Sequence, residues 1–98
     1  MLKKNLSKSG KFCRVTFEYL PPEKAETVSL CGEFNDWNPE ANSMAQRKDG
    51  RFSVTLSLET GKAYRFKFLI DGKIWENDSE ADGFRLNEFG TEDSVVSV

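Results

Sequence analysis

Apolar and polar side chains alternate along most of this chain. In FCRVTFEYL, residues 12–20, every second residue from Cys13 to Tyr19 is apolar or aromatic. The same period of two recurs in residues 27–34, 51–58 and 62–70. This period indicates β-strands that bury one face, because successive side chains point to opposite sides of a strand. The segments therefore predict strands that share one apolar core.

The phase of the alternation predicts which side chains fill that core. The residues expected to point inward are Cys13, Val15, Phe17, Tyr19, Val28, Leu30, Phe52, Val54, Leu56, Leu58, Tyr64, Phe66, Phe68, Ile70, Val96 and Val98. The residues between them are expected to point outward, among them Glu18, Cys31 and Lys67. Phe34 continues the inward phase of its own segment, so it is expected to pack in the core.

Turn-forming sequences separate these segments. Asp49-Gly50 is typical of a type I′ hairpin turn, in which both central residues need φ > 0. Shorter strands are expected near residues 43–47, 73–76 and 94–98, whereas residues 77–93 are expected to be acidic and irregular. The other interruptions are Pro21-Pro22, Thr60-Gly61 and Asp71-Gly72.

About seven short strands, with no segment of helical period, predict an all-β fold. In a chain of 98 residues they favour an immunoglobulin-like antiparallel β-sandwich. Residues 1–10 are expected to form a basic, flexible leader, and residues 11–98 a single domain.

Composition argues against catalysis. The sequence contains no histidine, which removes the commonest general base, the His-dependent triads and most zinc sites. No serine or cysteine lies in a nucleophile-elbow sequence, and no Gly-rich phosphate loop is present in the sequence. We therefore expect a protein that is not an enzyme and that needs no cofactor.

Charge and hydropathy limit the classes of partner that the chain is expected to bind. A net charge of −2 and the lack of an apolar run of ~20 residues argue against nucleic-acid and membrane partners. The start, MLKKNLSKSGK, has no apolar signal segment, so the expected location is the cytoplasm, with Cys13 and Cys31 as free thiols.

DSEADG, residues 78–83, resembles half of a calcium loop, but Phe89 occupies its twelfth position. An acidic surface loop without metal is expected there.

Two tryptophans remain as candidate ligand-binding residues. Trp37 follows the second strand, Trp75 follows the Asp71-Gly72 turn, and Lys67 faces outward on the strand that enters that turn. A pyranose has an apolar C–H face that stacks on an indole, and hydroxyls that bond to amides, carboxylates and lysines. The polar groups expected nearby are Asn35, Asn38, Asn77, Asn87 and Asp93. Residue types alone leave a second interpretation open, because a tryptophan in a β-sandwich also serves as a core residue.

The order of these residues resembles family 48 carbohydrate-binding modules. The resemblance rests on VSLCGEFNDW, then DGRFSVTLSLETGKAYRFKFLIDG, then an early Trp, then EFGTEDSVVSV, and it covers residues 12–98. The chain looks most like the glycogen-binding domain of the AMP-activated protein kinase β subunit. The same domain type precedes the catalytic barrel of isoamylases and branching enzymes. The resemblance implies an early-set immunoglobulin-like sandwich.

The family's sugar-binding positions fall on six residues of this chain: Trp37, Lys67, Trp75, Phe89, Thr91 and Asp93. Two positions depart from the kinase pattern. Two residues instead of one separate Gly72 from Trp75, and Asp93 replaces an Asn. An Asn side chain accepts and donates hydrogen bonds, whereas an ionised Asp only accepts them.

The resemblance implies non-catalytic binding of α-1,4-linked glucans, such as glycogen, starch, maltooligosaccharides or cyclodextrin. It also implies a role in tethering or regulating a glycogen-metabolising partner. An alternative is a protein-interaction module on the same sandwich that has lost sugar binding and uses an exposed strand edge.

Overall fold

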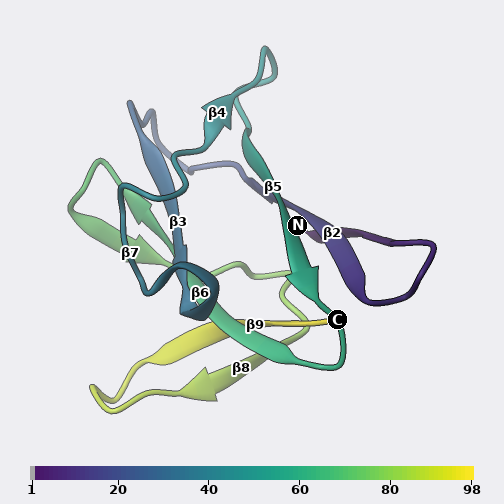
Figure 1. Ribbon diagram of the computed structural model, residues 1–98. Coiled ribbons are helices and arrows are strands. Elements are labelled where there is room, and N and C mark those ends of the chain that lie inside the picture. The colour runs from purple at the N-terminus through teal and green to yellow at the C-terminus, as the bar shows by residue number, and fades with distance from the viewer. Residues whose placement is uncertain (1) are drawn as a thin grey trace.

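Two antiparallel sheets face each other in the computed structural model, which describes residues 2–98 (Figure 1). The first sheet has the strand order β1-β2-β5-β4. Its strands are β1 (Leu2–Leu6), β2 (Phe12–Tyr19), β5 (Phe52–Glu59) and β4 (Ala45–Gln46).

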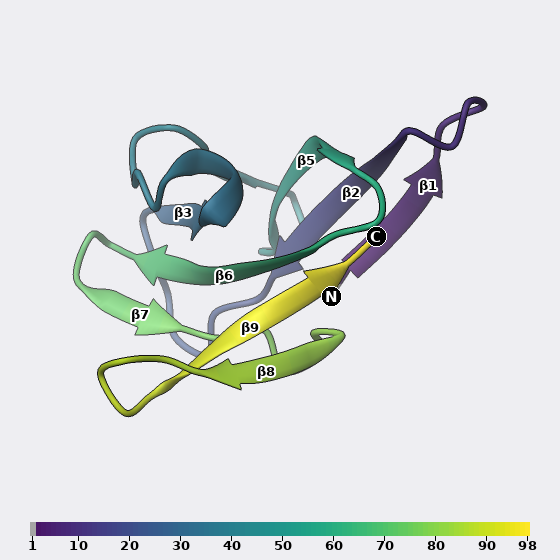
Figure 2. The same ribbon diagram turned by 60° about the horizontal axis from the view of Figure 1, so that its bottom comes forward.

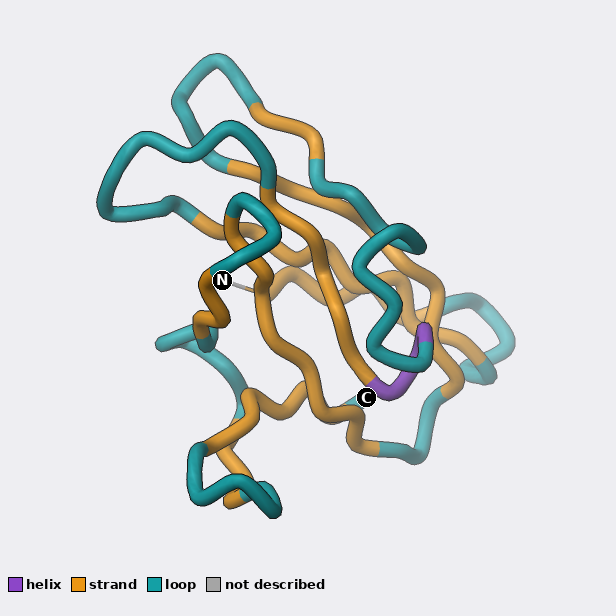
Figure 3. The backbone as a smooth tube through the Cα atoms, turned by 90° about the vertical axis from the view of Figure 1, so that its left-hand side faces the viewer, coloured by secondary structure: helices purple, strands orange, loops and turns teal. Residues whose placement is uncertain are grey.

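The second sheet has the order β3-β6-β9-β8, and β7 also pairs with β6. Its strands are β3 (Val28–Gly32), β6 (Ala63–Ile70), β9 (Glu92–Ser97), β8 (Gly83–Leu86) and β7 (Ile74–Glu76). Figure 2 shows β7 and β9 following one another along the same side of β6. A single 3₁₀ turn, η1 (Glu33–Asn35), follows β3 (Figure 3).

The inward residues predicted from the alternation form the core. Val15, Phe17, Leu30, Phe66 and Phe68 are fully buried between the sheets. Aromatic rings connect the two layers, with Phe17 of β2 edge-on to Phe66 of β6 at a centroid distance of 5.1 Å. The prediction of an all-β antiparallel sandwich is therefore confirmed, with nine strands among residues 2–98 where about seven were expected.

The two extra strands, β1 and β8, lie in segments that were expected to contain no strand. Leu2–Leu6 forms β1, which pairs with β2 over five positions, whereas a flexible leader was expected there. Met1 of that expected leader lies outside the described residues. Gly83–Leu86 forms β8 inside the segment expected to be irregular, and β9 begins at Glu92, before the expected start. β1 contains two lysines and β8 begins with a glycine. Both residue types are depleted in strands, so neither segment was predicted as a strand.

Two residues, Glu18 and Cys31, point outward as predicted but are nevertheless buried. Glu18 is 2% exposed because Arg47 and Lys3 cover its carboxylate, with N–O distances of 2.5 and 3.7 Å. Cys31 is fully buried on the outer face of the second sheet, opposite Lys67 in the strand register. Both cysteines are free thiols, as expected.

The turn at Asp49-Gly50 is not of type I′, contrary to the prediction. Only Gly50 has a positive φ, of 90°. The Asp49 carboxylate accepts the Arg51 N–H at 3.0 Å, a local bond that suits an Asp with ordinary φ. At Asp71-Gly72 both residues have positive φ, and the turn that leads to Trp75 has the type I′ pattern. Within residues 2–98, no helix is long and apolar enough to cross a membrane.

Candidate functional site

An open groove of about 980 Å³ lies on the outer face of the second sheet. It contains all six residues proposed by the family resemblance: Trp37, Lys67, Trp75, Phe89, Thr91 and Asp93. They come from the loop after η1, from β6, from β7 and from the β8–β9 hairpin, so the fold brings together four separate segments. The other lining residues are Glu33, Arg65, Asn87 and Glu88.

The backbone at Trp37 is held in an uncommon conformation. Asp36 and Trp37 both have left-handed φ values, of 55° and 58°, and such values are rare for residues other than glycine. The Trp37 N–H donates to the Gly32 carbonyl at 2.9 Å. The Asn35 side chain closes the same loop by accepting the Gly32 N–H at 3.0 Å and donating to the Leu30 carbonyl at 2.9 Å. These bonds hold the half-buried Trp37 at the groove.

The two aromatic residues of FNDW have different roles: Phe34 packs in the core, and Trp37 lies at the groove. Phe34 packs against the core, with its ring centroid 5.6 Å from that of Phe17 and 6.1 Å from that of Tyr64. Trp37 lines the groove. The prediction that Phe34 packs inward and Trp37 does not fill the core is confirmed.

Gly32 permits the tight passage from β3 into this loop. A Cβ atom at Gly32 would lie 2.5 Å from the Arg65 carbonyl oxygen and 2.8 Å from the Phe34 ring. Pairing between β3 and β6 stops here, so the next N–H of β6 lacks a strand partner on that side. Glu33 supplies one, because its carboxylate accepts the Arg65 N–H at 2.7 Å. Glu33 therefore extends the sheet at the groove wall.

Trp75 lies on the groove face because of the β6–β7 turn. The Lys73 N–H donates to the Ile70 carbonyl at 3.0 Å, and the register then places Trp75 opposite Leu69. Leu69 and Lys67 share one face of β6, so Trp75 joins them on the outer face. Trp75 is 47% exposed, which leaves ring surface available to a ligand.

A carboxylate with two cations lies at the base of the groove. Asp93 of β9 is 7% exposed. Its oxygens are 3.7 Å from an Arg65 guanidinium nitrogen and 3.9 Å from the Lys67 ammonium. Arg65 precedes Lys67 by two positions, so both point outward from β6. Arg65 was expected to face outward beside Lys67 but was not among the site residues proposed from the sequence, although this spacing could have found it.

Of the four asparagines expected near the site, one lines the groove and three form hydrogen bonds with backbone groups. Asn87 lines the groove. Asn35 closes the η1 loop, and Asn38 accepts the Glu40 N–H at 3.0 Å. Asn77 accepts the Ser94 N–H at 3.0 Å and donates to the Glu92 carbonyl at 2.8 Å. Asn35, Asn38 and Asn77 thus stabilise loops and are not among the groove-lining residues.

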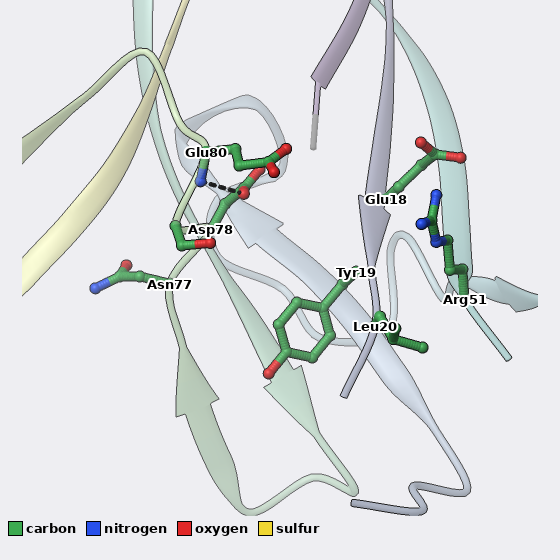
Figure 4. A pocket seen from close by; sticks show the side chains of 8 residues that line it. Glu18, Tyr19, Leu20, Arg51, Asn77, Asp78 and Glu80 are labelled. Atoms are coloured by element: carbon green, nitrogen blue, oxygen red, sulfur yellow. Dashed lines mark hydrogen bonds between the residues drawn. The ribbon is translucent and has the colours of Figure 1, made fainter. Parts of the chain in front are cut away.

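A smaller hollow of about 190 Å³ lies between the end of β2 and the loop after β7. Figure 4 shows Glu18 and Arg51 on one side of it and Asn77, Asp78 and Glu80 on the other. Asp78 is 3% exposed and accepts the Glu80 N–H at 2.9 Å. The expected acidic surface loop thus has a buried carboxylate at its start, which organises the loop backbone.

A two-sheet sandwich that presents tryptophan rings beside hydrogen-bonding side chains has the features of a non-catalytic carbohydrate-binding module. Comparison with known proteins supports this class. The family model described as the glycogen recognition site of AMP-activated protein kinase matches residues 13–98. The chain belongs to this family.

Curated relatives share the module as a small part of much longer proteins. A 1,4-alpha-glucan branching enzyme of Xanthomonas campestris is 33% identical over 67 residues, which cover 66% of this chain and 9% of the enzyme. A branching enzyme of Synechococcus elongatus is 35% identical over 63 residues, covering 62% of this chain and 8% of the enzyme. An amylopullulanase of Thermoanaerobacter thermohydrosulfuricus is 34% identical over 59 residues, covering 56% and 4%. The chain therefore spans less than a tenth of these relatives.

Proposed function

We propose that the groove binds α-1,4-linked glucan by stacking glucose rings on Trp37 and Trp75. The observation that carries this proposal is that both tryptophans line one open groove together with Lys67. Two stacking rings separated by hydrogen-bonding groups suit a chain of repeated sugar units better than a single sugar.

The side chains in the groove match the two surfaces of a glucose unit. The C–H face of the ring carries partial positive charge and is attracted to the negative face of an indole. Lys67 donates hydrogen bonds to ring hydroxyls, and Thr91 can donate or accept them. Phe89, which is 82% exposed at the tip of the β8–β9 hairpin, adds a third apolar surface at the groove edge.

The affinity expected from this contact is weak. Two indole faces that each bury ~100 Å² contribute roughly 5 kcal/mol before the cost of association. The dissociation constant should then lie between about 1 mM and 1 µM. Repeated sites along a polymer raise the effective concentration of the module, so its role would be to tether a glycogen-metabolising partner to glucan in the cytoplasm.

Native affinity electrophoresis tests the proposal. Glycogen or β-cyclodextrin cast in the gel should retard the wild-type protein, and Trp37→Ala should migrate as if no glucan were present. Circular dichroism should show the same fold for both proteins, because Trp37 lies on the η1 loop outside the core cluster. A wild-type protein that is not retarded, in a gel where a starch-binding module shifts, contradicts the proposal.

A protein-interaction module is the second candidate, and the β8 edge favours it. β8 ends the order of the second sheet, so one of its sides is unpaired among the described strands. Phe84 and Leu86 on this strand are 43% and 71% exposed, and such an edge can pair with a strand of another protein. Excess maltoheptaose should not displace a partner bound at this edge, whereas it should displace one that depends on Trp37.

A further inference from the structure

The hairpin loop between β8 and β9 is cross-linked by one side chain. The Asn87 carbonyl oxygen accepts the N–H groups of Phe89 and Thr91 at 3.0 and 3.1 Å. Its amide nitrogen donates to the Thr91 hydroxyl at 2.7 Å and to Asp93 at 3.0 Å. An amide offers two donor hydrogens and two acceptor lone pairs, so Asn87 uses its full hydrogen-bonding capacity inside the protein.

These bonds determine how the loop meets the groove. Phe89 is 82% exposed, so its position comes from its backbone, and the Asn87 carbonyl oxygen holds its N–H. The Thr91 hydroxyl accepts a hydrogen from Asn87, so its own hydrogen remains available to donate. Gly90 closes the loop with a φ of 80°, and its N–H donates to the backbone carbonyl of Asn87 at 3.2 Å.

The same amide also determines the role of Asp93. One Asp93 oxygen accepts from Asn87 and lies 3.9 Å from Lys67, and the other lies 3.7 Å from Arg65. Both oxygens of this buried carboxylate therefore face groups of the protein. An ion pair in this position orients the Lys67 ammonium at the groove base.

We propose that Asn87 is the positioning residue of the groove. It holds Phe89 and Thr91 in the orientation in which they meet the glucan, and it keeps Asp93 as a counter-ion for Lys67 and Arg65 instead of a sugar ligand. The inference rests on the glucan-binding function proposed above.

A double-mutant comparison tests whether Asn87 acts through the loop. The proteins are the wild type, Asn87→Ala, a Phe89→Ala/Thr91→Ala variant and the triple variant, titrated with β-cyclodextrin by NMR. Asn87→Ala should weaken binding about tenfold, because two side chains must then be ordered on association. In the variant that already lacks Phe89 and Thr91, the same change should weaken binding clearly less than tenfold, because only the hydrogen bond to Asp93 is then lost and coupled residues are not additive.

Amide hydrogen exchange gives a readout that needs no ligand. In Asn87→Ala the N–H groups of Phe89 and Thr91 should exchange faster, whereas the N–H of Phe66 in the core strand β6 should keep its protection. The matched control is Asp49→Ala, which removes a comparable bond to Arg51 in the β4–β5 hairpin outside the groove. This control should leave β-cyclodextrin affinity unchanged.

The possible outcomes separate the inference from the function on which it rests. A wild-type protein without affinity for β-cyclodextrin overturns the glucan-binding function, and the inference with it. A wild-type protein that binds while Asn87→Ala binds equally well overturns the inference alone. So does an equal loss of affinity in the presence and absence of Phe89 and Thr91, because Asn87 would then act by another route.

Discussion

The two outer faces of the sandwich arise from the same alternation but carry different chemistry. On the first sheet, Thr16 and Thr55 lie opposite each other and share a hydrogen bond of 2.9 Å, and Glu18 is covered by two cations. On the second sheet, Lys67 and Trp75 line an open groove. Polar groups on the first face bond to each other, whereas the second face gathers aromatic and polar side chains around a groove. A period of two therefore identifies an outer face but does not reveal its function.

Trp75 and Phe12 provide the largest test of this difference. Each is an aromatic residue on an outer face, with 47% and 45% of the residue exposed. Trp75→Ala should weaken glucan binding roughly 70-fold, because ~100 Å² of ring contact is worth about 2.5 kcal/mol. Phe12→Ala should change affinity less than about twofold, because Phe12 lies on the first sheet. Calorimetric titration with maltoheptaose measures both, and equal losses would show that exposure alone, without the groove, accounts for binding.

Gly32 tests whether the groove wall requires close packing. Gly32→Ala should lower the free energy of unfolding by about 2 kcal/mol, because its Cβ would meet the Arg65 carbonyl oxygen at 2.5 Å. Gly83→Ala is the matched control in the same sheet, since a Cβ there meets nothing within 4 Å. Urea unfolding of the two variants should differ clearly, with Gly83→Ala within about 0.5 kcal/mol of the wild type. Similar stabilities would mean that the β3–η1 passage relaxes easily.

The core was predictable from the sequence because burial follows the period of two. Two strands were missed for local reasons. In LKKNL the inward position between Leu2 and Leu6 is Lys4, whose ammonium reaches Asp82 at 2.6 Å and the Ser97 carbonyl at 2.9 Å. A lysine satisfied at the sheet edge thus interrupts the apolar pattern of β1. In β8 the apolar residues remain exposed, so no burial pattern accompanies pairing.

The groove was predictable only in part. Residue chemistry suggested Trp37, Trp75, Lys67 and Asp93, whereas Phe89 and Thr91 came from the family resemblance alone. Periodicity could not show that four separate segments meet. Glu33 depends on where β3 stops pairing with β6, and a single sequence does not specify strand register. Asn87 was recognised as a nearby amide, but its four bonds depend on the folded shape of the hairpin. Glu18 and Cys31 show the same limit, since outward direction did not imply exposure.

Arg47 tests whether charge on the first face serves stability alone. Arg47→Ala removes a cation 2.5 Å from Glu18, which is 2% exposed, and should cost about 1.5 kcal/mol of stability. Glucan affinity should remain unchanged, because Arg47 is not among the groove-lining residues. Lys48→Ala, a neighbouring exposed change, is the control and should have little effect on either quantity. Weaker glucan binding by Arg47→Ala would show that the two faces are coupled.

Burial of Cys31 should make the free energy of unfolding fall at alkaline pH. This effect should be the smallest of the four predicted for Trp75, Gly32, Arg47 and Cys31. Burial raises the pKa of its thiol above the ordinary value of 9.0. Above that pH the unfolded chain loses the thiol proton while the folded chain keeps it, so the stability present below pH 9.0 falls as pH rises towards the folded pKa. The loss cannot exceed about 1.4 kcal/mol per pH unit for one group.

Urea unfolding at about pH 8 and about pH 9.5 measures this loss. Cys31→Ala should remove it from that interval, although the smaller side chain lowers stability at both pH values. Burial and the Glu76 charge raise the pKa of Tyr19 as well, from its ordinary value of 10.0, so Tyr19→Phe should alter the pH dependence only above that value. An unchanged pH dependence in Cys31→Ala would mean that the thiol opposite Lys67 in the strand register reaches solvent readily.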